Sequence, residues 1–424
     1  MGDSLRADAP PVPALRVTSM DQFRGLTILL MFAVHYAGFS WGVNLAPVFR
    51  HNGYYLSVGD LAFPWFHLAA GFALRLTLLR RLRTHGAWAA YGRVVRRCLL
   101  LILLGNVEPL LLGGLHVSRW GPEQRSDPLA LLATYVKLDG WTILAIIGVT
   151  SLWVAPVIGR SVRVRVGFLL GGLALHALAM QVFYLDFMRG RPNFVEAALG
   201  TIGVPSREGG PLGFLVWAVP QLVGSLVYDL IVAVRPERCF RVLLGSGLVL
   251  VGIGYGLSCL SSFYPVAQGP RAHTYVYPDS QQPVKSPVIP PFREGSTDEG
   301  AARLPYPPCV PPPPERQRVW NYWMMSRHLC TPTFMLTATG FGLITYAFFV
   351  FLCDARALRV GVLRTLGQNP LIAYLLDMNV GGLMNDIWPE DGGLPWALAG
   401  AAVRFALAYV PVRLLEWRRI YLRL

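Results

Sequence analysis

Residues 20–36 read MDQFRGLTILLMFAVHY and residues 59–76 read GDLAFPWFHLAAGFALRL, and these two stretches decide the fold. In each of them a short polar opening is followed by a long apolar run. A helix needs about 20 mostly apolar residues to cross a bilayer. The two stretches therefore predict an all-α membrane protein that begins with two membrane-spanning helices.

The composition of the whole chain favours the same class. Of its 424 residues, 54% are hydrophobic and 15% are charged, against roughly 25% charged in soluble domains. The mean hydropathy is +0.44. Six cysteines are too few for a disulfide-rich secreted protein. The net charge of +14 does not indicate a nucleic-acid binder, because the basic residues lie in short clusters between apolar runs.

Ten stretches of the chain are long and apolar enough to span a bilayer. We interpret residues 1–424 as a single transmembrane domain. Residues 1–17 hold three prolines and no apolar core, so we expect no cleavable signal peptide. The predicted spans centre on residues 25–45, 58–79, 97–115, 139–159, 166–185, 213–234, 242–262, 333–353, 366–386 and 394–414.

The arginines predict the orientation of these spans. Cytoplasmic loops carry an excess of Lys and Arg, and every second connecting segment is rich in arginine when the N-terminus is placed inside. Ten spans with both termini in the cytoplasm fit this pattern. Lys137 and Lys285 are the two lysines among 38 basic residues, a skew typical of a GC-rich genome. We expect a bacterial inner membrane.

The long outer loop, residues 263–332, differs from the other loops. Its prolines, including the run 311–314, favour extended polyproline II, and its tyrosines and tryptophans are too many for a disordered linker. We interpret it as a lid on the outer face, inserted between the seventh and eighth spans. A disulfide between Cys309 and Cys330 would close it in an oxidising periplasm. The alternative is two unpaired thiols.

Several ionisable residues lie in the first two spans, where such groups are costly and usually functional. Asp21 and Arg24 are three residues apart, so they are expected to form an ion pair at the inner end of the first helix. Asp60 opens the second span, either as a helix cap or as a functional carboxylate. His67, further along that span, is more typical of a hydrogen bond between helices than of catalysis.

Other familiar motifs are missing from the sequence. It has no HExxH or similar metal-ligand spacing, no Walker loop, no dinucleotide fingerprint and no GxSxG. We therefore predict no metal site and no serine hydrolase. His51 stands out instead, because a loop histidine beside Asn52 is not needed for packing, and a histidine is the usual general base.

The motifs in the first quarter of the chain resemble one family of membrane enzymes. Residues 21–25 (DQFRG), the HNG loop at 51–53 and residues 59–66 (GDLAFPWF) resemble the opening of the heparan-alpha-glucosaminide N-acetyltransferase family. Gly71, Arg96-Arg97 and the late motif Gly367-x-Asn369 with Tyr374 extend the resemblance, which is dense over residues 18–110 and thinner over 355–390.

The resemblance implies an acyltransferase that passes acetyl from cytoplasmic acetyl-coenzyme A to an amino sugar on the far side of the membrane. It implies that His51 is the active-site histidine. His35 stands where the family has an asparagine, which brings two histidines to one site and leaves the choice of amine or hydroxyl acceptor open.

Acyl transfer needs a base and donors for the developing oxyanion. We expect His51 to be the base, with His35, Tyr36 or Asn52 as donors and Asp60 orienting the histidine. The expected residues for coenzyme A, acting through its phosphates at the inner rim, are Asp21, Arg24, Arg96, Arg97 and Asn369.

The expected partners are acetyl-coenzyme A, a saccharide acceptor and the lipid bilayer, with a homodimer left open. The alternative function is a proton-coupled secondary transporter with Asp60, His67 and Glu108 as a proton relay. Transporters usually show two related halves, and we see no internal repeat here.

Overall fold

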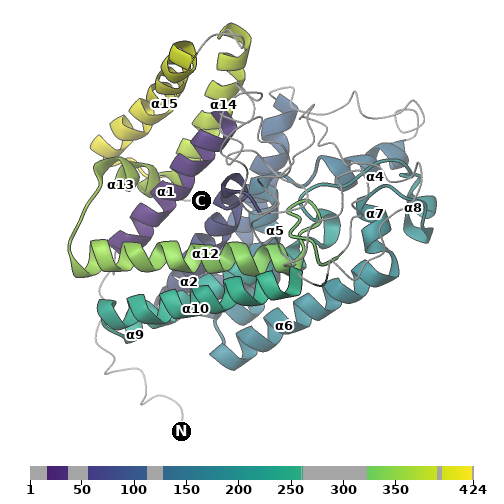
Figure 1. The fold of residues 1–424 in the computed structure, drawn as a ribbon, viewed down its shortest axis with the longest axis horizontal. Coiled ribbons are helices and arrows are strands. Elements are labelled where there is room, and N and C mark those ends of the chain that lie inside the picture. The colour runs from purple at the N-terminus through teal and green to yellow at the C-terminus, as the bar shows by residue number, and fades with distance from the viewer. Residues whose placement is uncertain are drawn as a thin grey trace, which may run out of the picture.

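All the regular secondary structure in the described part of the chain is helical. The computed structural model describes residues 17–36, 56–111, 128–258, 260, 322–388 and 394–422, and within these ranges it contains helices and no strand. Figure 1 shows them packed into one bundle. The α-helices are α1 (Thr18–His35), α2 (Ala62–Leu111), α4 (Pro128–Leu138), α5 (Ile143–Ile158), α6 (Val162–Ala179), α7 (Leu185–Met188), α8 (Phe194–Leu199), α9 (Phe214–Ala233), α10 (Pro236–Ser258), α12 (Pro332–Phe349), α13 (Gly361–Gln368), α14 (Pro370–Ile387) and α15 (Leu394–Trp417).

Short 3₁₀ and π segments join or extend several of these helices. They are η3 (Val58–Asp60), η5 (Met180–Tyr184), η6 (Gly210–Leu212) and η9 (Val350–Ala355). Segment η5 continues α6 and η9 continues α12, so each of these spans is longer than its α-helical part.

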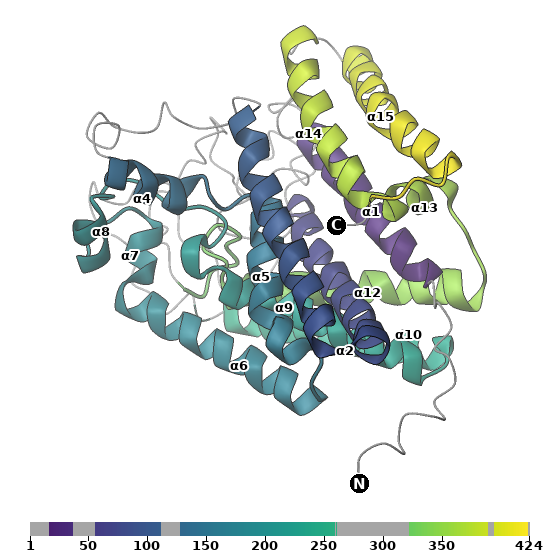
Figure 2. The ribbon, with the colours of Figure 1, turned by 180° about the vertical axis from the view of Figure 1, so that it is seen from behind.

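Helix α2 is a hairpin of two helical arms that meet at Gly86. Its backbone there has φ 77° and ψ 173°, a conformation open essentially to glycine alone. Leu74 and Leu78 of the first arm belong to the same buried cluster as Ala90 and Val94 of the second. The arms, which lie side by side in Figure 2, correspond to the predicted spans at 58–79 and 97–115.

Glycines allow two pairs of helices to cross with their backbones in contact. A Cβ on Gly25 of α1 would lie 1.8 Å from the carbonyl oxygen of Leu363 in α13, and a Cβ on Gly367 would lie 1.7 Å from that of Asp21. A Cβ on Gly71 of α2 would lie 1.8 Å from the carbonyl oxygen of Gln221 in α9. Small residues at such crossings are typical of membrane helices.

The helices fit a membrane protein with several spans. Each of the ten predicted stretches contains a helix or one arm of α2. Five helical stretches are long and apolar enough to cross a bilayer, or six if α4 and α5, which bend by 85°, form one broken span. The all-helical fold is therefore confirmed, and a multi-pass membrane protein is indicated. The number of ten spans stays a prediction.

The predicted disulfide in the outer loop is wrong. Cys330 is a free thiol with 0% exposure, and its Sγ donates to the carbonyl oxygen of Arg327 at 3.1 Å. Burial, with a further contribution from the nearby Glu208 carboxylate, raises the pKa of this thiol well above its usual value. Most of the predicted lid, including Cys309, lies outside the described residues.

The end of the predicted lid that the structure describes is packed against the bundle. Tyr322, Met324 and Leu329 belong to one buried cluster with Tyr184 and Phe187, which lie at the end of the α6 span. This contact fixes the position of the loop that carries Arg327.

Candidate active site

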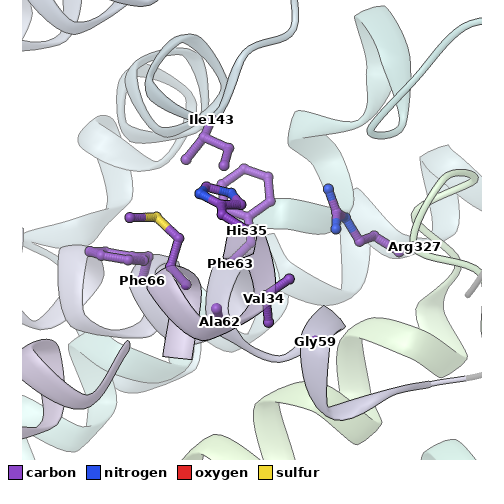
Figure 3. Close-up of a pocket in the computed structure, with 9 residues that line it drawn as sticks. Val34, His35, Gly59, Ala62, Phe63, Phe66, Ile143 and Arg327 are labelled. Atoms are coloured by element: carbon purple, nitrogen blue, oxygen red, sulfur yellow. The ribbon is translucent and has the colours of Figure 1, made fainter. Parts of the chain in front are cut away.

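A cavity near the predicted outer end of α1 brings together parts of three helices and the loop before α12. Its empty volume is about 380 Å³, and we call it the outer cavity. Figure 3 shows His35 beside Phe63 and Ile143, with Arg327 on another side of the cavity. His35 and Arg327 supply its ionisable side chains. The lining residues are Met31, Val34, His35, Gly59, Ala62, Phe63, Phe66, Ile143 and Arg327.

His35, the last residue of α1, is bonded to a buried carboxylate. Its Nδ1 lies 2.6 Å from Oδ2 of Asp377 in α14. Arg404 of α15 donates to the other oxygen of that carboxylate, Oδ1, from Nε at 3.1 Å and from Nη2 at 2.9 Å. Three helices from opposite ends of the chain therefore meet at one ionic cluster.

Asp60 has a local and a long-range role at the same cavity. Its Oδ2 accepts hydrogen bonds from the backbone N and the Oγ of Ser57, which closes a capping box at the start of η3. Its Oδ1 lies 3.6 Å from Nη1 of Arg327, which also pairs with Glu208. Asp60 therefore caps the helix entry and holds the arginine that lines the cavity.

A second and larger cavity, with an empty volume of about 650 Å³, lies towards the predicted inner side. We call it the inner cavity. Arg24 and Arg97 are its two charged lining residues. The others are Phe66, Ala69, Ala70, Ala73, Leu101, Ile143, Leu144, Ile147, Pro370, Leu371 and Tyr374.

The two arginines of the inner cavity differ in their partners. Arg24 pairs with Asp21 at 2.5 Å, so the predicted ion pair is confirmed. Arg97 makes no hydrogen bond or ion pair with any residue that the structure describes. Among the described lining residues there are therefore two guanidinium groups, one paired with a carboxylate and one not.

The two cavities share part of their walls. Phe66 of α2 and Ile143 of α5 line both of them. These two side chains therefore stand between the histidine of one cavity and the arginines of the other.

Two other residues predicted to bind coenzyme A, Arg96 and Asn369, do not line the inner cavity. Arg96 is exposed on the second arm of α2, in a cluster with Arg80, Arg81 and Arg93. Burial and the positive charges of Arg93, Arg80 and Arg96 lower the pKa of Arg81 in this cluster. Such a cluster is also what positive-inside topology alone produces.

Asn369 is 1% exposed, and its side chain forms hydrogen bonds with the C-terminal segment. Its Nδ2 donates to the carbonyl oxygen of Ile420 at 3.0 Å, and its Oδ1 accepts from the backbone N of Leu422 at 3.2 Å. The neighbouring Pro370 and Leu371 line the inner cavity, whereas Asn369 itself does not.

The structure describes two more side chains that the sequence singled out, Tyr36 and His67. Tyr36 donates its hydroxyl to the carbonyl oxygen of Ala397 at 2.6 Å, which ties α1 to α15. His67 is fully buried, with its ring 4.7 Å from that of Trp217. His51 and Asn52 lie outside the described residues, so their role as base and donor stays a prediction.

The proposed proton relay of a transporter finds no support in these contacts. Asp60 is engaged with Ser57 and Arg327, and His67 bonds to the carbonyl oxygen of Phe63 in its own helix at 3.3 Å. The side chain of Glu108 lies outside the described residues. Within the described part of the chain, no hydrogen bond joins Asp60 to His67.

Sequence reasoning missed Arg327, Glu208 and Arg404 as members of this site. Arg327 lies in the long outer loop and Arg404 in the last span, 27 residues from its partner Asp377. An arginine inside an apolar span is the one signal that could have indicated Arg404, since such a residue usually has a buried partner.

Comparison with known proteins finds a partial similarity to one membrane enzyme. The chain is 35% identical over 111 residues to heparan-alpha-glucosaminide N-acetyltransferase of Mus musculus, which covers 25% of this chain and 16% of that protein. The chain has distant, partial similarity to this enzyme. The protein of the same name from Homo sapiens is 34% identical over 96 residues, covering 22% of this chain and 13% of that protein. No family model matches the chain.

The similarity therefore spans less than a fifth of the length of either relative. It supports the resemblance seen in the motifs of the first quarter of the chain. It does not extend to the acceptor.

Proposed function

We propose that this protein passes an acetyl group from cytoplasmic acetyl-coenzyme A to an amine or hydroxyl of an extracytoplasmic saccharide. The observation that carries the proposal is the pair of cavities that share Phe66 and Ile143. One contains a histidine and the other two arginines, so a donor and an acceptor can approach the shared wall from opposite sides of the membrane.

The inner cavity suits the donor. Coenzyme A carries several phosphates, which arginine binds well through paired hydrogen bonds. Arg97, with no carboxylate partner among the described residues, is the best candidate for a phosphate, and Arg24 lies beside it. Ala69, Ala70 and Ala73 follow along one side of the cavity. Their small side chains leave room for the pantetheine arm.

The outer cavity suits the acceptor. Its histidine is a suitable proton acceptor, and Arg327 is a charged donor that is already held in place by Asp60 and Glu208. In the orientation that the arginines predict, both chain termini lie in the cytoplasm and this cavity opens to the other side.

The test measures acetyl-coenzyme A binding to the purified chain by its effect on the melting temperature. A ligand that binds only the native state must raise this temperature. Arg97→Gln should weaken acetyl-coenzyme A binding about 10-fold to 100-fold, because a hydrogen bond to a charged group contributes about 1.5–3 kcal/mol. Arg163→Gln, an exposed arginine of another predicted inner segment, is the control and should bind normally. No response of the wild-type chain to acetyl-coenzyme A would contradict the proposal.

A further inference from the structure

We infer that Asp377, held by Arg404, orients His35 so that Nε2 of His35 is the proton acceptor for acetyl transfer. This inference rests on the proposed function and assigns the base to His35, whereas the family resemblance points to His51. In this assignment, Asp377 and Arg404 are positioning residues that act through the histidine.

The hydrogen bonds fix which nitrogen of His35 carries the proton. Asp377 is 0% exposed and Arg404 is 4% exposed. Arg404 donates twice to Oδ1 of Asp377 in a buried ion pair, which leaves Oδ2 for His35 at 2.6 Å. An ionised carboxylate only accepts hydrogen bonds, so Nδ1 of His35 must donate. The lone pair of the neutral ring is then on Nε2.

The helices are shaped to hold this cluster. Arg404 also donates from Nη2 to the backbone carbonyl oxygen of Asp377 at 3.3 Å. A Cβ on Gly381, one turn further along α14, would lie 2.5 Å from the same Nη2. The glycine therefore leaves the space that the guanidinium occupies, and the arginine contacts both the side chain and the backbone of the residue that it positions.

The ring of His35 lies at the outer cavity, where the acceptor is proposed to bind. It packs beside Phe63 and Ile143 (Figure 3), and Ile143 also borders the inner cavity. A proton acceptor at this wall is close to the place where the acyl group would arrive. A carboxylate behind the ring stabilises the imidazolium that forms during the reaction.

The chemical step balances with acetyl-coenzyme A as the acyl donor. The amine or hydroxyl of the saccharide attacks the thioester carbonyl carbon as Nε2 of His35 takes its proton. The new C–N or C–O bond forms and the C–S bond breaks. The thiolate of coenzyme A leaves with the electron pair and takes the proton from the imidazolium, which yields free coenzyme A and returns His35 to its neutral form.

The first test compares acetyl transfer by Asp377→Asn with the wild-type chain. An asparagine can present its amide N–H to Nδ1, which favours the wrong tautomer, so kcat should fall about 10²-fold to 10⁴-fold. The KM and the affinity for acetyl-coenzyme A should stay within about twofold, since the arginines of the inner cavity are untouched. Asn379→Ala is the matched control. This residue is exposed on the same helix, bonds to its own helix at Leu375, and should leave kcat unchanged.

A double variant separates positioning from structure. If Asp377 acts through His35, the variant with both His35→Asn and Asp377→Asn should be no slower than His35→Asn alone. A further large loss in the double variant, or a wild-type kcat in Asp377→Asn, would overturn the inference.

A measurement on the unchanged protein covers the case in which Asp377→Asn does not fold. ¹⁵N NMR of histidine-labelled protein, at a pH where the ring is neutral, should show His35 protonated at Nδ1, with the signal assigned by its loss in His35→Asn. Protonation at Nε2 would overturn the inference. If the wild-type chain transfers no acetyl group at all, it is the proposed function that has failed, and the NMR result still tests the hydrogen-bond geometry.

Discussion

His35 and His51 compete for one role at the scale of single residues. The resemblance favours His51, and the structure gives His35 a buried carboxylate partner. If His35 is the base, His35→Asn should lower single-turnover acetyl transfer about 10²-fold to 10⁴-fold, whereas His51→Ala should cost less. Acetyl-coenzyme A affinity, measured in parallel, should be nearly unchanged in both. A dead His51→Ala beside an active His35→Asn would reverse the assignment.

Cys330 gives a second prediction at this scale. The thiolate is the reactive form of cysteine, and burial raises the pKa of this thiol well above its usual value. Maleimide should therefore fail to label Cys330 in the folded protein at pH 7 to 8. It should label Cys330 after unfolding without any reductant, because the thiol is free. Mass spectrometry of the labelled peptides reads both results, and a peptide of Cys330 that is protected until reduction would show a disulfide.

Some contacts between residues could be predicted and others could not. The Asp21–Arg24 pair follows from a spacing of three on one helix. The pair of His35 and Asp377 joins residues 342 positions apart. It depends on how α1 and α14 pack, which no local pattern in the chain encodes. The same holds for Arg327 and Asp60.

At the scale of the helices, the glycines of the motifs that carry the resemblance have a packing role, and no catalytic role is needed to explain them. Gly25 and Gly367 bring α1 and α13 into backbone contact, and Gly71 does so for α2 and α9. The apolar runs predicted α1, α2 and α9, whereas α13 lies mostly before the predicted stretch 366–386 and was not predicted as a separate helix. The sequence also suggested the glycines, but only the packed structure shows that they are needed for close approach.

Gly71→Ala tests this explanation. The new methyl would lie 1.8 Å from the carbonyl oxygen of Gln221, so α2 and α9 would have to separate. Overpacking of this kind typically costs about 1–3 kcal/mol, which should lower the melting temperature by several degrees. Gly245→Ala in α10 is the matched control, because a Cβ there meets nothing within 4 Å. Equal melting temperatures for the two variants would show that the crossing tolerates a side chain.

At the scale of the whole molecule, the predicted orientation places the two cavities towards opposite sides of the membrane. Reporter fusions after Gln282 should be active in the periplasm, and fusions at the C-terminus should be active in the cytoplasm, because arginine-rich segments stay inside. A periplasmic C-terminus would contradict the topology, and with it the assignment of the inner cavity to coenzyme A.

The most direct test of the central claim follows acetyl groups across the membrane. Sealed inside-out membrane vesicles that contain the protein would receive labelled acetyl-coenzyme A outside and would hold a panel of amino and neutral sugars inside. We predict that labelled acetyl-saccharide accumulates inside the vesicles, and that Arg97→Gln and His35→Asn each reduce it strongly while Arg163→Gln does not. No labelled product inside, or the same amount in vesicles without the protein, would contradict the account.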